Sequence, residues 1–169
     1  MKVPTKMNLL TKTNEETVEL LSVAYSILDG IPRERIDLGT FQYDRNRSCW
    51  TDGPIRDASE IGCGTLACGG GWISLHPYFQ ELGLYVKAPY GDIQTRHIAS
   101  AHDAFDALAH TFSLTPRETA FLFESYGSHY GEISDELAGT EVQKSDKALW
   151  LWRCKFLIDR IKSGIRYGS

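Results

Sequence analysis

Side chains able to bind a metal or carry out thiol chemistry gather in one glycine-rich stretch of this 169-residue chain, at Cys63, Cys68 and His76. Thiolate and imidazole groups are the usual protein ligands of zinc, and Cys49 or Cys154 would complete a set of four. The Cys63–Cys68 spacing lies at the edge of the common zinc patterns, and no second close pair of cysteine or histidine residues accompanies it. Zinc is therefore one candidate cofactor, with Cys63, Cys68 and His76 as its ligands.

Two other interpretations of the same residues stay open. If a helix begins near Thr65, Cys68 lies in its first turn, where the helix N-terminus lowers the pKa of a thiol. Cys68 would then be a nucleophile or redox thiol, with His76 as its base. Alternatively, both cysteines are small buried side chains that fill space beside the glycines. The sequence favours this last interpretation, because neither a complete ligand set nor a Cys-His-Asn signature is visible.

Three consecutive glycines, Gly69 to Gly71, lie in the middle of the helix expected over residues 66–75. Each glycine costs a helix about 1 kcal/mol relative to alanine, so this segment has little intrinsic helical preference. The usual compensation is the close approach of another backbone or a ligand, which only a residue without a Cβ permits. We therefore expect the stretch to be buried, with Thr65 as the N-cap and Pro77 ending the helix.

The motif Cys63-Gly64-Thr65-x-x-Cys68-x-x-Gly71-Trp72, followed by Phe79 and Gly83-Leu84, resembles one found in small uncharacterised proteins of bacteria and phages. In those proteins a later segment resembles residues 114–123 of this chain, so the resemblance covers about residues 60–124. It implies no catalytic activity. It suggests an accessory factor that acts on a host protein.

Composition excludes several classes of protein. A net charge of −4 argues against broad nucleic-acid binding, which needs a basic surface. No apolar run approaches the roughly 18 residues of a membrane-spanning helix, so no membrane partner is expected. The N-terminal residues lack the apolar core of a signal peptide, which makes the cytoplasm the expected compartment and keeps the cysteines reduced.

Capping patterns and apolar periodicity predict a mainly α-helical protein. Thr13 and Glu16 form a capping box before a helix that stops at Gly30, and Thr115 with Glu118 forms another. Ser145 caps a last helix that runs to about residue 162. We expect a flexible arm over residues 1–12 and a single globular domain over residues 13–169. That domain would contain about five helices and at most a small two-stranded β element, from residues 38–43 and 85–90.

Two segments offer candidate binding residues. The first is the polar loop over residues 44–53, which contains Trp50 and Asp52 within about thirty residues that show no regular element. The second is the last helix, which is apolar on two faces. Its outer stripe is predicted to be buried in the core or to contact a partner, and consists of Leu149, Trp152 and Phe156.

No constellation of nucleophile, base and orienting group emerges, so an enzyme is not the expected class. The expected function is that of a small protein-binding or inhibitory accessory protein, in which Trp50, Asp52 and the outer stripe contact a host factor. The stripe instead forms a homodimer if the partner is a second copy of the chain. The alternative is a zinc- or thiol-dependent protein that uses Cys63, Cys68 and His76.

Overall fold

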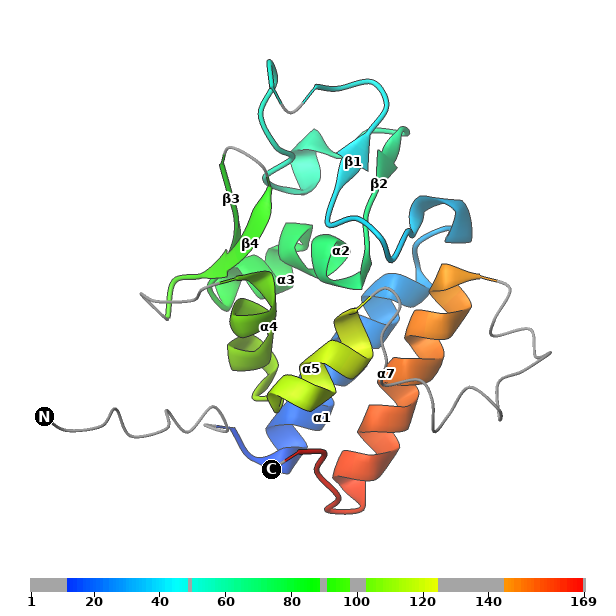
Figure 1. Ribbon diagram of the computed structural model, residues 1–169, viewed down its shortest axis with the longest axis vertical. Helices are drawn as coiled ribbons and strands as arrows, with labels where there is room; N and C mark the ends of the chain where they lie inside the picture. The colour runs from blue at the N-terminus through cyan, green and yellow to red at the C-terminus, as the bar shows by residue number, and fades with distance from the viewer. Residues whose placement is uncertain (1–11, 49, 89–90, 98–102, 125–144, 169) are drawn as a thin grey trace, which may run out of the picture.

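The computed structural model describes residues 12–48, 50–88, 91–97, 103–124 and 145–168 (Figure 1). The fold is mainly α-helical, as the sequence predicts. The α-helices in the described residues are α1 (Asn14–Asp29), α2 (Gly69–Leu75), α3 (Pro77–Glu81), α4 (Ala104–Phe112), α5 (Pro116–Phe123) and α7 (Asp146–Lys162). The remaining elements are the short 3-10 helices η1 (Arg33–Arg35) and η2 (Ala58–Glu60), and the strands β1 (Tyr43–Asp44), β2 (Thr65–Leu66), β3 (Leu84–Lys87) and β4 (Asp92–Thr95). The arm predicted over residues 1–12 lies outside the described residues except for Lys12.

Local side-chain hydrogen bonds start the long helices where the sequence indicates. The Thr13 hydroxyl accepts the Glu16 amide at the start of α1, and the Ser145 hydroxyl accepts the Ala148 amide at the start of α7. The reciprocal capping box of Thr115 and Glu118 is complete at the start of α5. Each cap satisfies an amide that has no partner within its helix.

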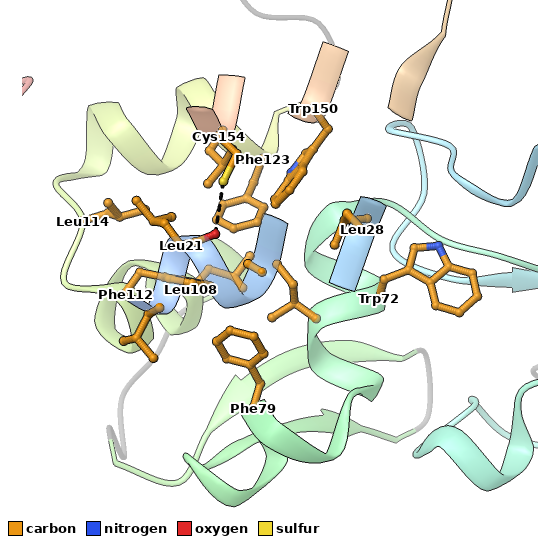
Figure 2. Close-up of a cluster of buried hydrophobic side chains, with 14 of the residues drawn as sticks. Leu21, Leu28, Trp72, Phe79, Leu108, Phe112, Leu114, Phe123, Trp150 and Cys154 are labelled. Carbon is orange, nitrogen blue, oxygen red and sulfur yellow. Dashed lines mark hydrogen bonds between the residues drawn. The ribbon is translucent and has the colours of Figure 1, made fainter. Parts of the chain in front are cut away.

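The core lies where α1, α7, α5 and α4 pack on α2 (Figure 2). Figure 1 shows α1 and α7 side by side, and α5 packs against α7. Trp150 and Cys154 come from the inner face of α7 and are fully buried. The Cys154 thiol donates to the carbonyl oxygen of Leu21 across 3.4 Å, the dashed contact of Figure 2. None of the described helices combines the length and the apolar character needed to cross a membrane.

Two separate antiparallel ribbons replace the single two-stranded element that the sequence suggested. In the first, Tyr43 of β1 pairs with Leu66 of β2. In the second, Leu84 of β3 pairs with Thr95 of β4. The segments 38–43 and 85–90 do not pair with each other within the described residues, because each meets a nearer partner strand.

The start of α2 corrects the expectation at Thr65. This residue is in β2, where its hydroxyl donates to an Asp44 carboxylate oxygen at 2.9 Å and accepts the Gly62 amide. The helix begins at Gly69 instead, and Cys68 is its N-cap. Thr65 cannot cap the helix because Leu66, the next residue, is also in β2 and pairs with Tyr43 of β1, so no helix follows directly.

The residues that follow α7 fold back against the starts of α1 and α5. Arg166 lies beside the buried carboxylate of Glu118, with Nη2 donating to Oε1 at 2.8 Å. The same guanidinium donates to the side chain of Asn14 and to the carbonyl oxygen of Ser113. This buried ion pair ties the chain end to the starts of α1 and α5.

Candidate functional site: the Trp50 loop

Residues 42–48 and 50–55, called here the Trp50 loop, include β1 and extend to the top of Figure 1. Two side chains fix the base of this loop. The side-chain Nε2 of Gln42 donates to the backbone carbonyl oxygen of Ile55 at 2.9 Å, and its Oε1 accepts a hydrogen bond from the backbone amide of Ile55 at 2.7 Å. One Asp44 oxygen accepts the Asn46 amide, and the other accepts the Thr65 hydroxyl. The base of the loop is therefore closed by side-chain to main-chain bonds rather than by a longer sheet.

Arg47 braces the interior of the Trp50 loop. Its Nε donates to the carbonyl oxygen of Gly53, and its Nη2 donates to those of Asp52 and Pro54, all at 3.1 Å. Nη2 also forms an ion pair with Glu60 of η2 at 2.7 Å. One guanidinium thus binds three successive backbone carbonyls. These bonds fix the path of the loop, although the loop has little regular secondary structure.

The Trp50 loop holds its aromatic side chains toward solvent. The Trp50 side chain is 79% exposed and that of Tyr43 is 55% exposed, the two most exposed large apolar side chains in the described residues. They line a pocket of about 340 Å³. The other lining residues are Gln42, Asp44, Arg47, Ser48, Gly53, Pro54 and Ile55. A braced loop that exposes two aromatic rings beside a hollow has the features of a recognition surface.

Asp52 has an internal role in this loop. Its carboxylate accepts the Ser48 amide at 2.9 Å, and its own amide donates to the Ser48 carbonyl oxygen at 2.8 Å. The side chain is exposed, but its described bonds shape the turn that presents Trp50. Cys49, which precedes Trp50, lies outside the described residues.

The outer stripe of α7 is half-buried. Leu149, Trp152 and Phe156 all pack against the core, so they form neither a fully buried nor a fully exposed face. Trp152 stacks on Phe156 with ring centroids 5.2 Å apart, and the Arg160 guanidinium lies 5.4 Å from the Phe156 ring. Much of the stripe's surface is thus covered by its own chain. Trp50 is by contrast far more exposed, so the Trp50 loop has more aromatic surface available to a partner than the outer stripe has.

Cys68 caps α2 rather than lying inside its first turn. Its sulfur accepts the Gly71 amide at 3.4 Å, and the side chain is 3% exposed. Burial raises the pKa of the Cys68 thiol to about 11, and this effect outweighs the opposing hydrogen bonds from the Gly71 and Gly70 amides. The expected lowering of the pKa is therefore wrong, because desolvation penalises the thiolate more than the helix N-terminus stabilises it.

The three predicted metal ligands occupy different environments. Cys63 is exposed in the turn before β2, whereas Cys68 is buried, and neither is in a disulfide. His76 lies between α2 and α3, where its Nδ1 accepts the Tyr78 amide at 3.2 Å and caps α3. Over the described part of the chain, no group of three or more histidine, cysteine or acidic side chains is arranged to hold a metal ion. Cys68 and His76 each cap a helix, and Cys63 lies in an exposed turn.

The glycines of α2 allow the close approaches that the sequence suggests. A Cβ on Gly69 would overlap the indole Nε1 of Trp150, and a Cβ on Gly71 would overlap the carbonyl oxygen of Phe41. At Gly70 the nearest atom would be the flexible Cδ1 of Leu108, at 2.9 Å. The neighbours are parts of this protein, so the glycine run serves packing.

Two residues of the candidate surface are not among the predicted site residues. Tyr43 ends the segment predicted as a possible strand, and its ring is exposed at the start of the polar loop. Arg47 is the second, because its bonds to residues 52–54 and to Glu60 depend on the fold of the loop and no local motif predicts them.

No known family model, curated protein or solved structure matches this chain. The resemblance of residues 60–124 to the bacterial and phage proteins therefore stays a prediction, and the functional argument rests on the geometry of the Trp50 loop.

Proposed function

We propose that this protein acts in the cytoplasm by stoichiometric binding to another protein, with the Trp50 loop as the contact surface and Trp50 as the anchor. The observation that carries this proposal is the 79% exposure of a tryptophan on a loop braced by Arg47. Exposing an indole to water is unfavourable in the isolated protein, and burying one in a partner supplies much of the energy of typical interfaces.

Rigidity of the loop supports the same function. A loop that is ordered before binding loses little conformational entropy when a partner arrives, so more of the contact energy appears as affinity. Gln42, Asp44 and Arg47 supply that order by bonding to the backbone of the loop and its base. The proposed partner is a host factor, as the resemblance in the central stretch suggests, and a second copy of the chain is the other outcome of the test.

The test compares three forms of the tagged protein in extracts of cells that naturally encode it. The forms are the native chain, Trp50→Ala, and a control, Tyr78→Ala, which removes another exposed aromatic, 37% exposed, on α3. Captured proteins are quantified by mass spectrometry, and the strongest is reconstituted from purified components to measure stoichiometry. Native mass of the purified chain alone reports self-association.

We expect a partner that is held by the native chain and by Tyr78→Ala, and lost with Trp50→Ala. Capture that survives Trp50→Ala would assign binding to another surface and overturn the proposal. A Trp152→Ala form tests the outer stripe of α7 in the same experiment. Loss of the partner only in that form would move the interface from the loop to α7.

A further inference from the structure

Three polar side chains that line the Trp50 pocket, those of Gln42, Asp44 and Arg47, are already bonded within the chain. Both ends of the Gln42 amide bind Ile55, and both oxygens of Asp44 accept hydrogen bonds. Arg47 is paired with Glu60. A charged ligand that bound these three side chains would compete with the bonds they already make, so its net gain would be small. The pocket therefore favours a ligand that needs few polar partners.

The wall of the pocket is also poorly suited to strand addition. A peptide that extends a sheet binds through a row of backbone amides and carbonyls along one edge. Here the carbonyl oxygens of residues 52–54 accept hydrogen bonds from Arg47, and the amide and carbonyl of Ile55 bind Gln42. This stretch of backbone is committed to the loop itself.

Apolar and aromatic surface is what the pocket still offers. The rings of Tyr43 and Trp50 are exposed, and Pro54 and Ile55 are buried residues that contribute to its lining. A hollow of about 340 Å³ has room for one or two apolar side chains rather than for a folded element.

We propose that the Trp50 pocket binds a proline-rich segment of the partner in the polyproline II conformation, with proline rings against Trp50 and Tyr43. Proline has no backbone amide, so such a segment needs no hydrogen-bond acceptor from the committed backbone carbonyls of the loop. The polyproline II helix has no internal hydrogen bonds and is ordered before binding, and aromatic-lined grooves are its usual docking sites. This inference rests on the proposed protein-binding function and names the chemistry of the partner.

The probe for this inference is a decaproline peptide, titrated into the full-length ¹⁵N-labelled protein and followed by two-dimensional NMR. The four tryptophan indoles provide internal reporters, since Trp72 and Trp150 are buried in the core and Trp50 is exposed. Peptides of alternating glutamate–alanine and lysine–alanine, matched in length, are the controls. Trp50→Ala and Tyr43→Ala are tested with decaproline, and their Trp72 and Trp150 signals show whether each variant is folded.

We expect saturable shifts of the Trp50 indole and of amides in residues 42–55 with decaproline, and unchanged Trp72 and Trp150 signals. The affinity should fall by about tenfold or more in either variant, and it should change little with salt because no ion pair forms. Absence of a shift at millimolar peptide, or equal shifts with an acidic or basic control peptide, would overturn the proline assignment.

Competition separates this inference from the function on which it rests. If decaproline displaces the partner captured through Trp50, both are supported. If the partner depends on Trp50 but decaproline neither binds nor competes, the loop is the interface and the proline chemistry is wrong. If capture does not depend on Trp50, both proposals fail.

Discussion

Gly71 of α2 lies against the carbonyl oxygen of Phe41, so close that a Cβ at position 71 would overlap that oxygen. Phe41 belongs to the segment that leads into β1 and the Trp50 loop. The contact therefore fixes the base of the Trp50 loop to the buried helix, and it explains why a glycine occupies the third position of a helix that glycine weakens.

Alanine substitutions along the glycine run should have very different effects on stability. Gly71→Ala must displace a backbone carbonyl, so the free energy of unfolding should fall by about 3 kcal/mol or more, as overpacking a core can cost. Gly70→Ala meets only the flexible end of Leu108, and the gain in helix propensity of about 1 kcal/mol offsets much of that contact. Urea unfolding of both variants checks the order. Equal losses for the two would contradict the contact described at Phe41.

The cysteines should differ in reactivity toward iodoacetamide in the native protein. Cys63 is exposed and should label readily at pH 8, whereas Cys68 and Cys154 are buried and should label only on unfolding. Burial raises the pKa of Cys68 to about 11 and raises that of Cys154 further above its ordinary value, so both remain thiols at pH 8. Peptide mass spectrometry scores each cysteine separately. Rapid native labelling of Cys68 would revive the thiol-chemistry hypothesis.

Removing the Arg47 brace should loosen the Trp50 loop while leaving the helical core folded. Arg47→Ala loses the bonds to residues 52–54 and the ion pair with Glu60, which is partly exposed and contributes little to global stability by itself. Chymotryptic cleavage after Trp50 or Tyr43 should accelerate several-fold, because cleavage requires local opening. Arg45→Ala is the control, since the Arg45 side chain is exposed and has no hydrogen bond or ion pair within the described ranges. Equal cleavage rates for Arg47→Ala and Arg45→Ala would show that the Arg47 bonds do not hold the loop closed.

His110 should make stability decline in mild acid. Burial lowers its pKa below the ordinary value of 6.5, and the charges of Lys12 and His97 act in the same direction. The unfolded chain therefore binds a proton more readily, so the contribution of His110 is present above pH 6.5 and is lost as the pH falls through the lower folded-state pKa. The free energy of unfolding at pH 8 and at pH 5 should differ more in the native protein than in His110→Gln. An identical pH dependence in both would contradict this assignment.

The sequence by itself determined the helical class and the helix starts at Thr13, Thr115 and Ser145. These features are local, because a cap side chain and the amide that donates to it lie within three residues of each other. It also showed that something must approach the glycine run closely, since three glycines in a helix require compensation.

Only the tertiary structure decided which atoms make that approach and which surface is exposed. Phe41 and Trp150 are distant from α2 in sequence, and the pairing of Thr65 and Leu66 with β1 leaves Cys68, rather than Thr65, as the N-cap of α2. The outer stripe of α7 proved half-buried because Phe121, from α5, packs against Phe156. Periodicity gives the faces of a helix but not its neighbours, which depend on contacts between distant segments.

The Trp50 loop shows the same division. Its polar composition predicts a loop, but its rigidity comes from Arg47 bonds to backbone carbonyls and to Glu60, which form only when the chain has folded around that guanidinium. Buried polar groups find their hydrogen-bond partners in the folded structure, and the structural preferences of single residues do not predict which partners those are. The exposure of Trp50 follows from that geometry, and with it the surface on which the proposed function depends.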